Sequence, residues 1–304
     1  MPRVTFTPLT PTIGALVGNV DLSRPLDEEQ IADIQAGLLR HKVIFFENQR
    51  LTPVQHRDFA ARFGALHTHP LYPGVPEAPE LFTLDNHLDN PTDNDSWHTD
   101  VTFIQTPPRA AILHAHRLPA CGGDTLWSNM QAAFEALSPA LRDFLVGLDA
   151  VHDFARGFPA DGVVARGAGA EKHARAVAAN PPVIHPVVRT HPETGADGLF
   201  VNTTFTDRIV DLTRKESDAI LGLLFDHIQK PEFIVRWRWS ENAIAFWDNQ
   251  ITQHYAVNDY LPARRIMVRA TILGDRPWHA SRLDADGRRG RPGQRAAVEA
   301  LERA

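Results

Sequence analysis

The stretch Phe233-Ile-Val-Arg-Trp-Arg-Trp239 alternates large apolar side chains with two arginines and one isoleucine. Because successive side chains of a β-strand point to opposite faces, this alternation predicts a strand with one buried face. Further short strand-like runs lie on both sides of it, each bounded by Pro, Gly, Asn or Asp. They cover residues 42–46, 81–84, 110–116, 182–188, 243–247 and 266–273.

Four places in the sequence carry the signals that begin a helix. Asp27-Glu-Glu-Gln30 and Thr213-Arg-Lys-Glu216 have the form of capping boxes, and Thr52 and Ser138 each precede a proline. These helices do not alternate with the strands in a βαβ rhythm. The order therefore predicts a mixed α+β chain that is mainly β, with a jelly-roll or barrel core braced by helices.

Composition narrows the classes of function and the kinds of site. The 304 residues include 31 Lys+Arg and 37 Asp+Glu, a net charge of −6 that argues against a nucleic-acid partner. No run approaches the roughly 18 apolar residues of a membrane span, and the opening residues lack the apolar core of a secretory signal. The single cysteine, Cys121, forbids an intrachain disulfide, so we expect a cytoplasmic protein without a membrane partner.

With one thiol, any metal must be held by histidine and carboxylate side chains. Two copies of His-x-Asp occur, at His87-Leu-Asp89 and His98-Thr-Asp100, and His67-Thr-His69 offers a further pairing. Residues i and i+2 of an extended segment share a face and can therefore bind one ion. Two imidazoles and one carboxylate leave three open positions, the arrangement of non-haem Fe(II) oxygenases. Spacing alone does not choose between these pairs.

Three longer segments carry a resemblance that does choose. They are 94–103 (Asn-Asp-Ser-Trp-His-Thr-Asp-Val-Thr-Phe), 122–127 (Gly-Gly-Asp-Thr-Leu-Trp) and 247–260, which begins Trp-Asp-Asn-Gln and contains His254. Together with 264–275 they closely resemble the Fe(II)/2-oxoglutarate-dependent taurine dioxygenases. The resemblance runs from about Thr7 to Pro277. It implies a double-stranded β-helix in a single domain over residues 1–280. Residues 281–304 have no counterpart in the family, and their arginines, spaced by Gly and Pro, predict a basic, flexible tail.

The family resemblance implies roles for individual residues around the metal. His98, Asp100 and His254 correspond to the iron ligands, which leaves His87 and Asp89 as a coincidental match. The far carboxylate of 2-oxoglutarate would meet Arg265, whose guanidinium can form a two-bond fork, and the hydroxyl of Thr125. The implied cofactor is Fe(II), with 2-oxoglutarate and O₂ as cosubstrates.

Substrate recognition is implied by a second arginine. Arg269 lies four residues after Arg265, so on a strand both would point into one cavity. The resemblance assigns Arg269 to the sulfonate of the substrate. Ser96 and Thr203-Thr204 depart from the family pattern. The resemblance therefore specifies the type of reaction more closely than it specifies the substrate. The other residues implied at the substrate are His69, Tyr72, Asn94, Val101 through its backbone, Phe158 and Phe205.

The implied reaction hydroxylates taurine at the carbon that bears the sulfonate, with succinate and CO₂ as coproducts. The product would break down to sulfite and aminoacetaldehyde, a route to sulfur. A sister enzyme acting on another alkyl sulfonate, an alkyl sulfate ester or an aryloxy acid is the alternative. A non-catalytic metal-binding jelly roll and a zinc hydrolase are more remote, because all three ligands and Arg265 are present. The family also implies a homo-oligomer.

Overall fold

The computed structural model describes residues 3–68, 74–91, 94–162, 165, 167 and 169–282. Its helices are α1 (Glu28–His41), α2 (Pro53–Ala61), α3 (Met130–Glu135), α4 (Pro139–Val146), α5 (Phe154–Gly157), α7 (Ala170–Ala179) and α8 (Arg214–His227). Two 3-10 helices are also present, η1 (Pro231–Phe233) and η2 (Ala280–Arg282).

The first eight strands are β1 (Thr5–Pro8), β2 (Ala15–Gly18), β3 (Val43–Phe46), β4 (Gly74–Val75), β5 (Ala78–Asn86), β6 (Ala110–Arg117), β7 (Thr125–Asn129) and β8 (Asp149–His152). The remaining strands are β9 (Val183–Pro186), β10 (Val188–Thr190), β11 (Asp197–Leu199), β12 (Thr206–Ile209), β13 (Ile234–Trp237), β14 (Ile244–Asp248), β15 (Thr252–Ala256) and β16 (Arg265–Ile272).

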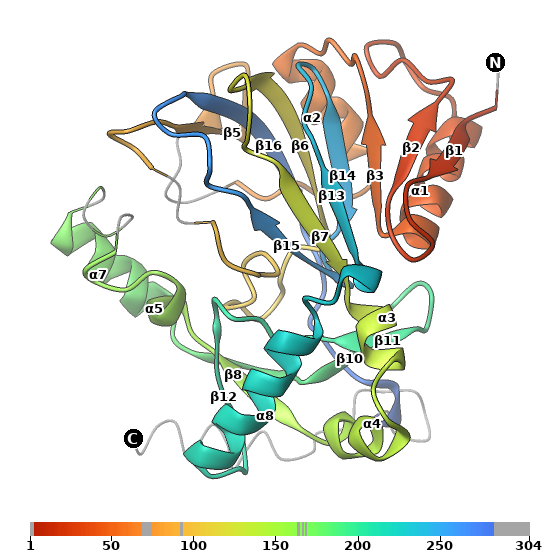
Figure 1. The fold of residues 1–304 in the computed structure, drawn as a ribbon. Helices are drawn as coiled ribbons and strands as arrows, with labels where there is room; N and C mark the ends of the chain where they lie inside the picture. The colour runs from red at the N-terminus through yellow and green to blue at the C-terminus, as the bar shows by residue number, and fades with distance from the viewer. Residues whose placement is uncertain are drawn as a thin grey trace.

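The core is a jelly roll made of two sheets. The large sheet has the order β1-β2-β3-β14-β6-β16-β5-β4, and a smaller sheet has the order β13-β7-β15 (Figure 1). One hydrophobic cluster joins them, because it contains Phe45, Trp247 and Met267 of the large sheet with Trp127 and Trp237 of the small one. The predicted mixed α+β fold with a mainly β core is confirmed.

The alternating stretch 233–239 has the burial pattern that the sequence predicts, but the strand itself, β13, covers only Ile234–Trp237, and Phe233 belongs to η1. Its odd-numbered residues are buried, whereas Arg236 and Arg238 are exposed. Trp237 stacks on Phe45 of β3, with ring centroids 4.2 Å apart and planes 10° apart. A stacked aromatic pair of this kind adds about 1 kcal/mol to the burial of its apolar surface. The stretch therefore packs the small sheet against the large one.

The four expected helix starts are also confirmed. Asp27, Thr52 and Thr213 each form a complete capping box, and the Ser138 hydroxyl accepts from the backbone N–H of Leu141. Helices α1 and α2 cover the outer face of the large sheet, where a second hydrophobic cluster lies (Figure 1). None of the helices in the described ranges is long and apolar enough to cross a membrane.

Three segments differ from the sequence-based expectation or extend it. Residues 182–188 contain all of β9 and the first residue of β10, and these two strands belong to different sheets. The helix-start signals in the sequence do not predict helix α7. Its N-cap residue is Gly169, which has no side chain to form a capping hydrogen bond. Within the expected tail, Arg282 donates to Asp149 at 2.6 Å. Residues 283–304, with the arginine cluster at 288–295, lie outside the described residues.

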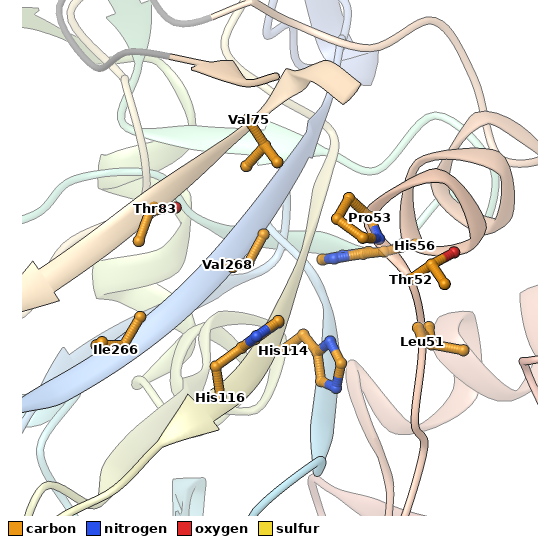
Figure 2. Close-up of a pocket in the computed structure, with 10 residues that line it drawn as sticks. All are labelled: Leu51, Thr52, Pro53, His56, Val75, Thr83, His114, His116, Ile266 and Val268. Carbon is orange, nitrogen blue, oxygen red and sulfur yellow. The ribbon is translucent and has the colours of Figure 1, made fainter. Parts of the chain in front are cut away.

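A cavity of about 240 Å³ lies between α2 and the outer face of the large sheet (Figure 2). Three imidazoles line it, from His56 of α2 and from His114 and His116 of β6. Within the described ranges, no ring nitrogen of His56 or His114 makes a hydrogen bond of normal geometry. Burial, reinforced by repulsion from the neighbouring imidazoles, lowers the pKa of His56 to about 3 and that of His114 to about 4. These rings are therefore neutral at pH 7.

The lowered pKa values of these histidines predict that acid destabilises the packing of α2 against the large sheet. The folded protein keeps His56 neutral, whereas the unfolded chain protonates it below pH 6.5, so its contribution is present above pH 6.5 and lost as pH falls toward 3. His56→Phe removes one such group. The loss of unfolding free energy between pH 7.5 and pH 5 should then shrink by about 2 kcal/mol. Urea unfolding at both pH values measures this, and equal losses in the two proteins would contradict it.

Candidate metal centre and anion pocket

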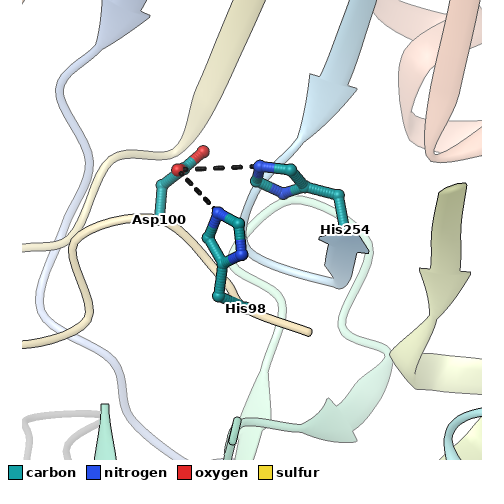
Figure 3. A group of neighbouring side chains, drawn as sticks. All are labelled: His98, Asp100 and His254. Carbon is teal, nitrogen blue, oxygen red and sulfur yellow. Dashed lines mark ion pairs between the residues drawn. The ribbon is translucent and has the colours of Figure 1, made fainter. Parts of the chain in front are cut away.

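The side chains of His98, Asp100 and His254 converge in the interior (Figure 3). His254 lies on β15, and the backbone of His98 pairs with it, each N–H donating to the other residue's carbonyl at 2.8 to 3.0 Å. Nε2 of His98 lies 3.7 Å from Asp100 Oδ1, and Nε2 of His254 lies 3.8 Å from the same oxygen. Three candidate donor atoms thus surround one point.

Hydrogen bonds around this group determine how its atoms point. Nδ1 of His98 lies 2.7 Å from the Ser96 carbonyl, which requires an N–H there and leaves the Nε2 lone pair facing Asp100. The Asn249 side chain accepts from the Asp100 N–H at 2.9 Å and donates to the Asp100 carbonyl at 3.2 Å. Val101 then turns the chain with φ of +55°, a conformation uncommon outside glycine. The Asp100 backbone is therefore held on both sides.

Arg269 forms an ion pair with Asp100 inside the protein. Its Nη2 lies 2.5 Å from Oδ2 and its Nη1 lies 3.0 Å from Oδ1. Burial alone would raise the pKa of Asp100, but Arg269, His254 and His98 together lower it well below its usual range. The carboxylate is therefore charged, and its Oδ1 faces the two imidazoles. The family resemblance implied a role for Arg269 at the substrate, and the structure shows its guanidinium in contact with the Asp100 carboxylate.

The alternative histidine pairs look different. His87 and Asp89 lie in a turn, with Nδ1 of His87 4.0 Å from Oδ2 of Asp89. The Asp89 side chain is 97% exposed. His67 is partly buried and its N–H donates to the Thr271 carbonyl, while its expected partner His69 lies outside the described residues. Among the residues that the structure describes, only the His98 group brings three possible metal ligands within 4.8 Å of one another.

A second charged group lies farther along β16. Arg265 is 5% exposed, and its Nε and Nη2 have no hydrogen-bond partner in the described ranges. Burial lowers the pKa of this guanidinium to about 10, with Tyr260 and Asp124 opposing the shift, so it stays charged at pH 7. A buried cation with free donors is costly unless an anion completes it. The position beside Arg265, called the anion pocket below, therefore suits a carboxylate.

Gly123 lies beside Arg265, and Thr125 follows it by two residues. Thr125 is 2% exposed and begins β7. Gly123 has φ of +72°, and a Cβ there would lie 3.2 Å from Cδ of Arg265. This close approach, together with the left-handed backbone, explains why glycine occupies the position.

The structure describes some of the implied substrate residues and not others. Phe205 belongs to one aromatic cluster with Phe103 and Phe154, and Phe158 and Val101 pack against it. The ring centroids of Phe158 and Phe205 are 5.8 Å apart. Asn94 accepts a backbone hydrogen bond from Ala256 of β15 through its carbonyl. His69 and Tyr72 lie outside the described residues, so their implied roles stay predictions.

Comparison with known proteins places this site in a family. The family model described as "Taurine catabolism dioxygenase TauD, TfdA family" matches residues 5–271. The chain belongs to the TauD/TfdA family. It is thus a 2-oxoglutarate-dependent dioxygenase that uses Fe(II), 2-oxoglutarate and O₂.

Similar TauD/TfdA proteins include several with names that mention sulfur-containing anions. An alkylsulfatase from Acinetobacter baylyi is 37% identical over 270 residues, which cover 88% of this chain and 84% of that protein. A Pseudomonas putida alpha-ketoglutarate-dependent sulfate ester dioxygenase is 38% identical over 272 residues, 89% of each. A crystal structure of a putative taurine dioxygenase from Burkholderia xenovorans is 37% identical, with TM-score 0.79 and coverage of 94% and 96%.

Two residues of this TauD/TfdA site were not singled out from the sequence. Asn249 lies in the quoted run 247–260, but nothing in its spacing shows that its amide holds the Asp100 backbone. Trp239 ends the alternating stretch that we interpreted as core, and its indole N–H donates to Thr125. Only the three-dimensional arrangement gives these residues a role near the site.

The His98 group predicts a clear result for metal binding. His254→Ala removes one of the three candidate donors and should lower Fe(II) affinity by at least about 100-fold. The fold should be kept, because the hydrogen bonds that pair residue 254 with His98 are made by the backbone. His87→Ala is the matched control and should leave Fe(II) binding unchanged, since its turn is exposed. Anaerobic equilibrium dialysis measures both. Metal binding that is lost in the control and kept in His254→Ala would reverse the assignment.

The unpartnered donors of Arg265 predict a loss of 2-oxoglutarate binding in Arg265→Ala. Leaving one end of the dianion without its cation should cost about 2 to 5 kcal/mol, or roughly 30-fold or more in dissociation constant. Lysine supplies the charge without the fork, so Arg265→Lys should restore little. Titration of the Fe(II)-loaded protein under anaerobic conditions measures both variants. Wild-type affinity in Arg265→Ala would rule out this role.

Proposed function

We propose that this dioxygenase hydroxylates a small alkyl sulfate ester or alkyl sulfonate, with the sulfate ester as the preferred class. His98, Asp100 and His254 are the proposed iron ligands, and Arg265 with Thr125 binds the far carboxylate of 2-oxoglutarate. When bound, iron would activate O₂, which is the oxidant for both 2-oxoglutarate and the substrate carbon. The protein's own part is to hold the substrate carbon in place and to exclude water.

The choice of substrate class rests on the aromatic cluster of Phe103, Phe154 and Phe205, against which Phe158 packs. It begins three residues after Asp100, and Val101, the next residue after that ligand, packs against it. An alkyl chain buried there gains about 0.8 kcal/mol per CH₂. Taurine would bring an ammonium group instead, which loses its hydration on entering an apolar site. The surroundings therefore favour an uncharged chain.

The charges support an anionic head group. Arg269 lies near Trp247 and reaches the Asp100 carboxylate, so a sulfate or sulfonate beside it would share a guanidinium that already neutralises one carboxylate. The names of the two curated relatives reported above support a sulfate ester, while the structural relative's name supports taurine. Taurine remains the second candidate, because an ammonium group can also rest on an aromatic face.

The inorganic product distinguishes these substrates. Hydroxylation of an alkyl sulfate at the carbon next to the ester oxygen gives an unstable intermediate that breaks into an aldehyde and hydrogen sulfate. The same hydroxylation of a sulfonate releases sulfite. One assay can therefore identify both the substrate and the bond that breaks.

We expect hexyl sulfate to give at least 10-fold higher kcat/KM than taurine, since several buried CH₂ groups each add to binding. The measurement follows substrate-dependent succinate, sulfate and sulfite for hexyl sulfate, hexanesulfonate, taurine and phenoxypropionate. Succinate formed without substrate serves as the uncoupled background. A higher kcat/KM for taurine would refute the preference for sulfate esters, and turnover of phenoxypropionate alone would refute both sulfur classes.

We make two further proposals, which concern the location of the protein in the cell and its oligomeric state. We propose that the protein acts in the cytoplasm, which its single cysteine supports. We also propose that it assembles as a homo-oligomer, as the family resemblance implies.

A further inference from the structure

Trp239 contacts both residues that are proposed to bind the far carboxylate of 2-oxoglutarate. It follows β13 by two residues and is 9% exposed. Its Nε1–H donates to Thr125 Oγ1 at 3.0 Å. The guanidinium carbon of Arg265 lies 5.8 Å from the centre of its ring. One indole therefore supports two separate parts of the same anion pocket.

The direction of the indole hydrogen bond determines what Thr125 can do. An indole N–H only donates, whereas a threonine hydroxyl has one hydrogen and two lone pairs. Because Oγ1 accepts from Trp239, its own hydrogen is left to donate to another group. Thr125 donates to no protein acceptor in the described part of the chain, so its hydroxyl hydrogen suits an incoming anion.

The charges around Arg265 leave it open to the same anion. Asp124 precedes Thr125 and could compete for this guanidinium, but Arg236 Nε binds its carboxylate at 2.7 Å. Tyr260, 5% exposed, also lies close enough to act on Arg265, but it has no charge at neutral pH. Contact with the face of Trp239 adds a cation–π attraction without using any N–H donor. Arg265 thus keeps its Nε and Nη2 donors for a ligand.

We propose that Trp239 is a positioning residue for 2-oxoglutarate. Its N–H makes the Thr125 hydroxyl a hydrogen-bond donor, and its ring holds the Arg265 guanidinium beside that hydroxyl. The residue thereby favours 2-oxo acids that carry a second carboxylate at the far end. This inference rests on the proposed roles of Arg265 and Thr125.

The chain offers a matched control in Trp237, two residues earlier. Trp237 is 8% exposed, its Nε1 has no hydrogen-bond partner among the described residues, and it stacks on Phe45. Trp239→Phe and Trp237→Phe each remove an indole N–H and leave an aromatic ring. Only the first removes a hydrogen bond to the pocket.

The experiment titrates Mn(II)-loaded protein with 2-oxoglutarate and, separately, with oxalate, which chelates a metal but has no far carboxylate. Trp239→Phe should weaken 2-oxoglutarate binding about 10-fold, the loss typical of a hydrogen bond that supports a charged group. Its oxalate binding should stay at the wild-type value. Trp237→Phe should bind both ligands as the wild type does.

A double-mutant cycle with Thr125→Val tests whether Trp239 acts through that hydroxyl. Once the hydroxyl is gone, Trp239→Phe should weaken 2-oxoglutarate binding less than it does in the wild type. Unchanged 2-oxoglutarate affinity in Trp239→Phe overturns the inference, and so does an equal loss of oxalate binding. If Arg265→Ala also binds 2-oxoglutarate normally, the proposed pocket itself fails. If only Trp239→Phe binds normally, the pocket stands and this inference alone fails.

Discussion

The structure of the site depends on one buried ion pair between Asp100 and Arg269. A carboxylate at 5% exposure would be expensive to keep charged without a cation beside it. Arg269 provides that cation from β16, while the Asp100 backbone is bound by Asn249 from the turn after β14. The pair thus connects the segment that carries His98 to the large sheet. Removing either partner would leave the other charge buried and unpaired.

The pair also affects how Asp100 can bind a metal. Arg269 Nη2 binds Oδ2 at 2.5 Å, whereas Oδ1 takes the longer contact from Nη1 at 3.0 Å and lies nearest the two histidine Nε2 atoms. A carboxylate held in this way offers one oxygen toward the imidazoles. Single-oxygen binding leaves more open positions on an octahedral ion than chelation by both oxygens would. The same guanidinium is therefore suited to shape the metal site and to meet an anionic substrate.

Sequence patterns predicted those parts of the molecule in which one local rule decides the outcome. Alternation at 233–239 identified a strand with a buried face, and capping boxes identified helix starts, because both depend on near neighbours. The grouping of His98, Asp100 and His254 came from family resemblance, since nothing local joins residue 100 to residue 254. The roles of Asn249 and Trp239 depend on contacts across more than 100 positions. Helix α7 has no capping residue, and its Ala-rich sequence was its only local signal.

Strand β16 serves two different environments with alternate residues. Arg265, Met267 and Arg269 face the space between the sheets, whereas Ile266 and Val268 line the cavity beneath α2. A single-residue insertion or deletion within the strand would exchange these two sets. Both arginines would then point toward neutral histidines, and aliphatic side chains would replace them at the anion pocket. Evolution or design can therefore lengthen this strand only in steps of two residues, or by adding a bulge that restores the alternation.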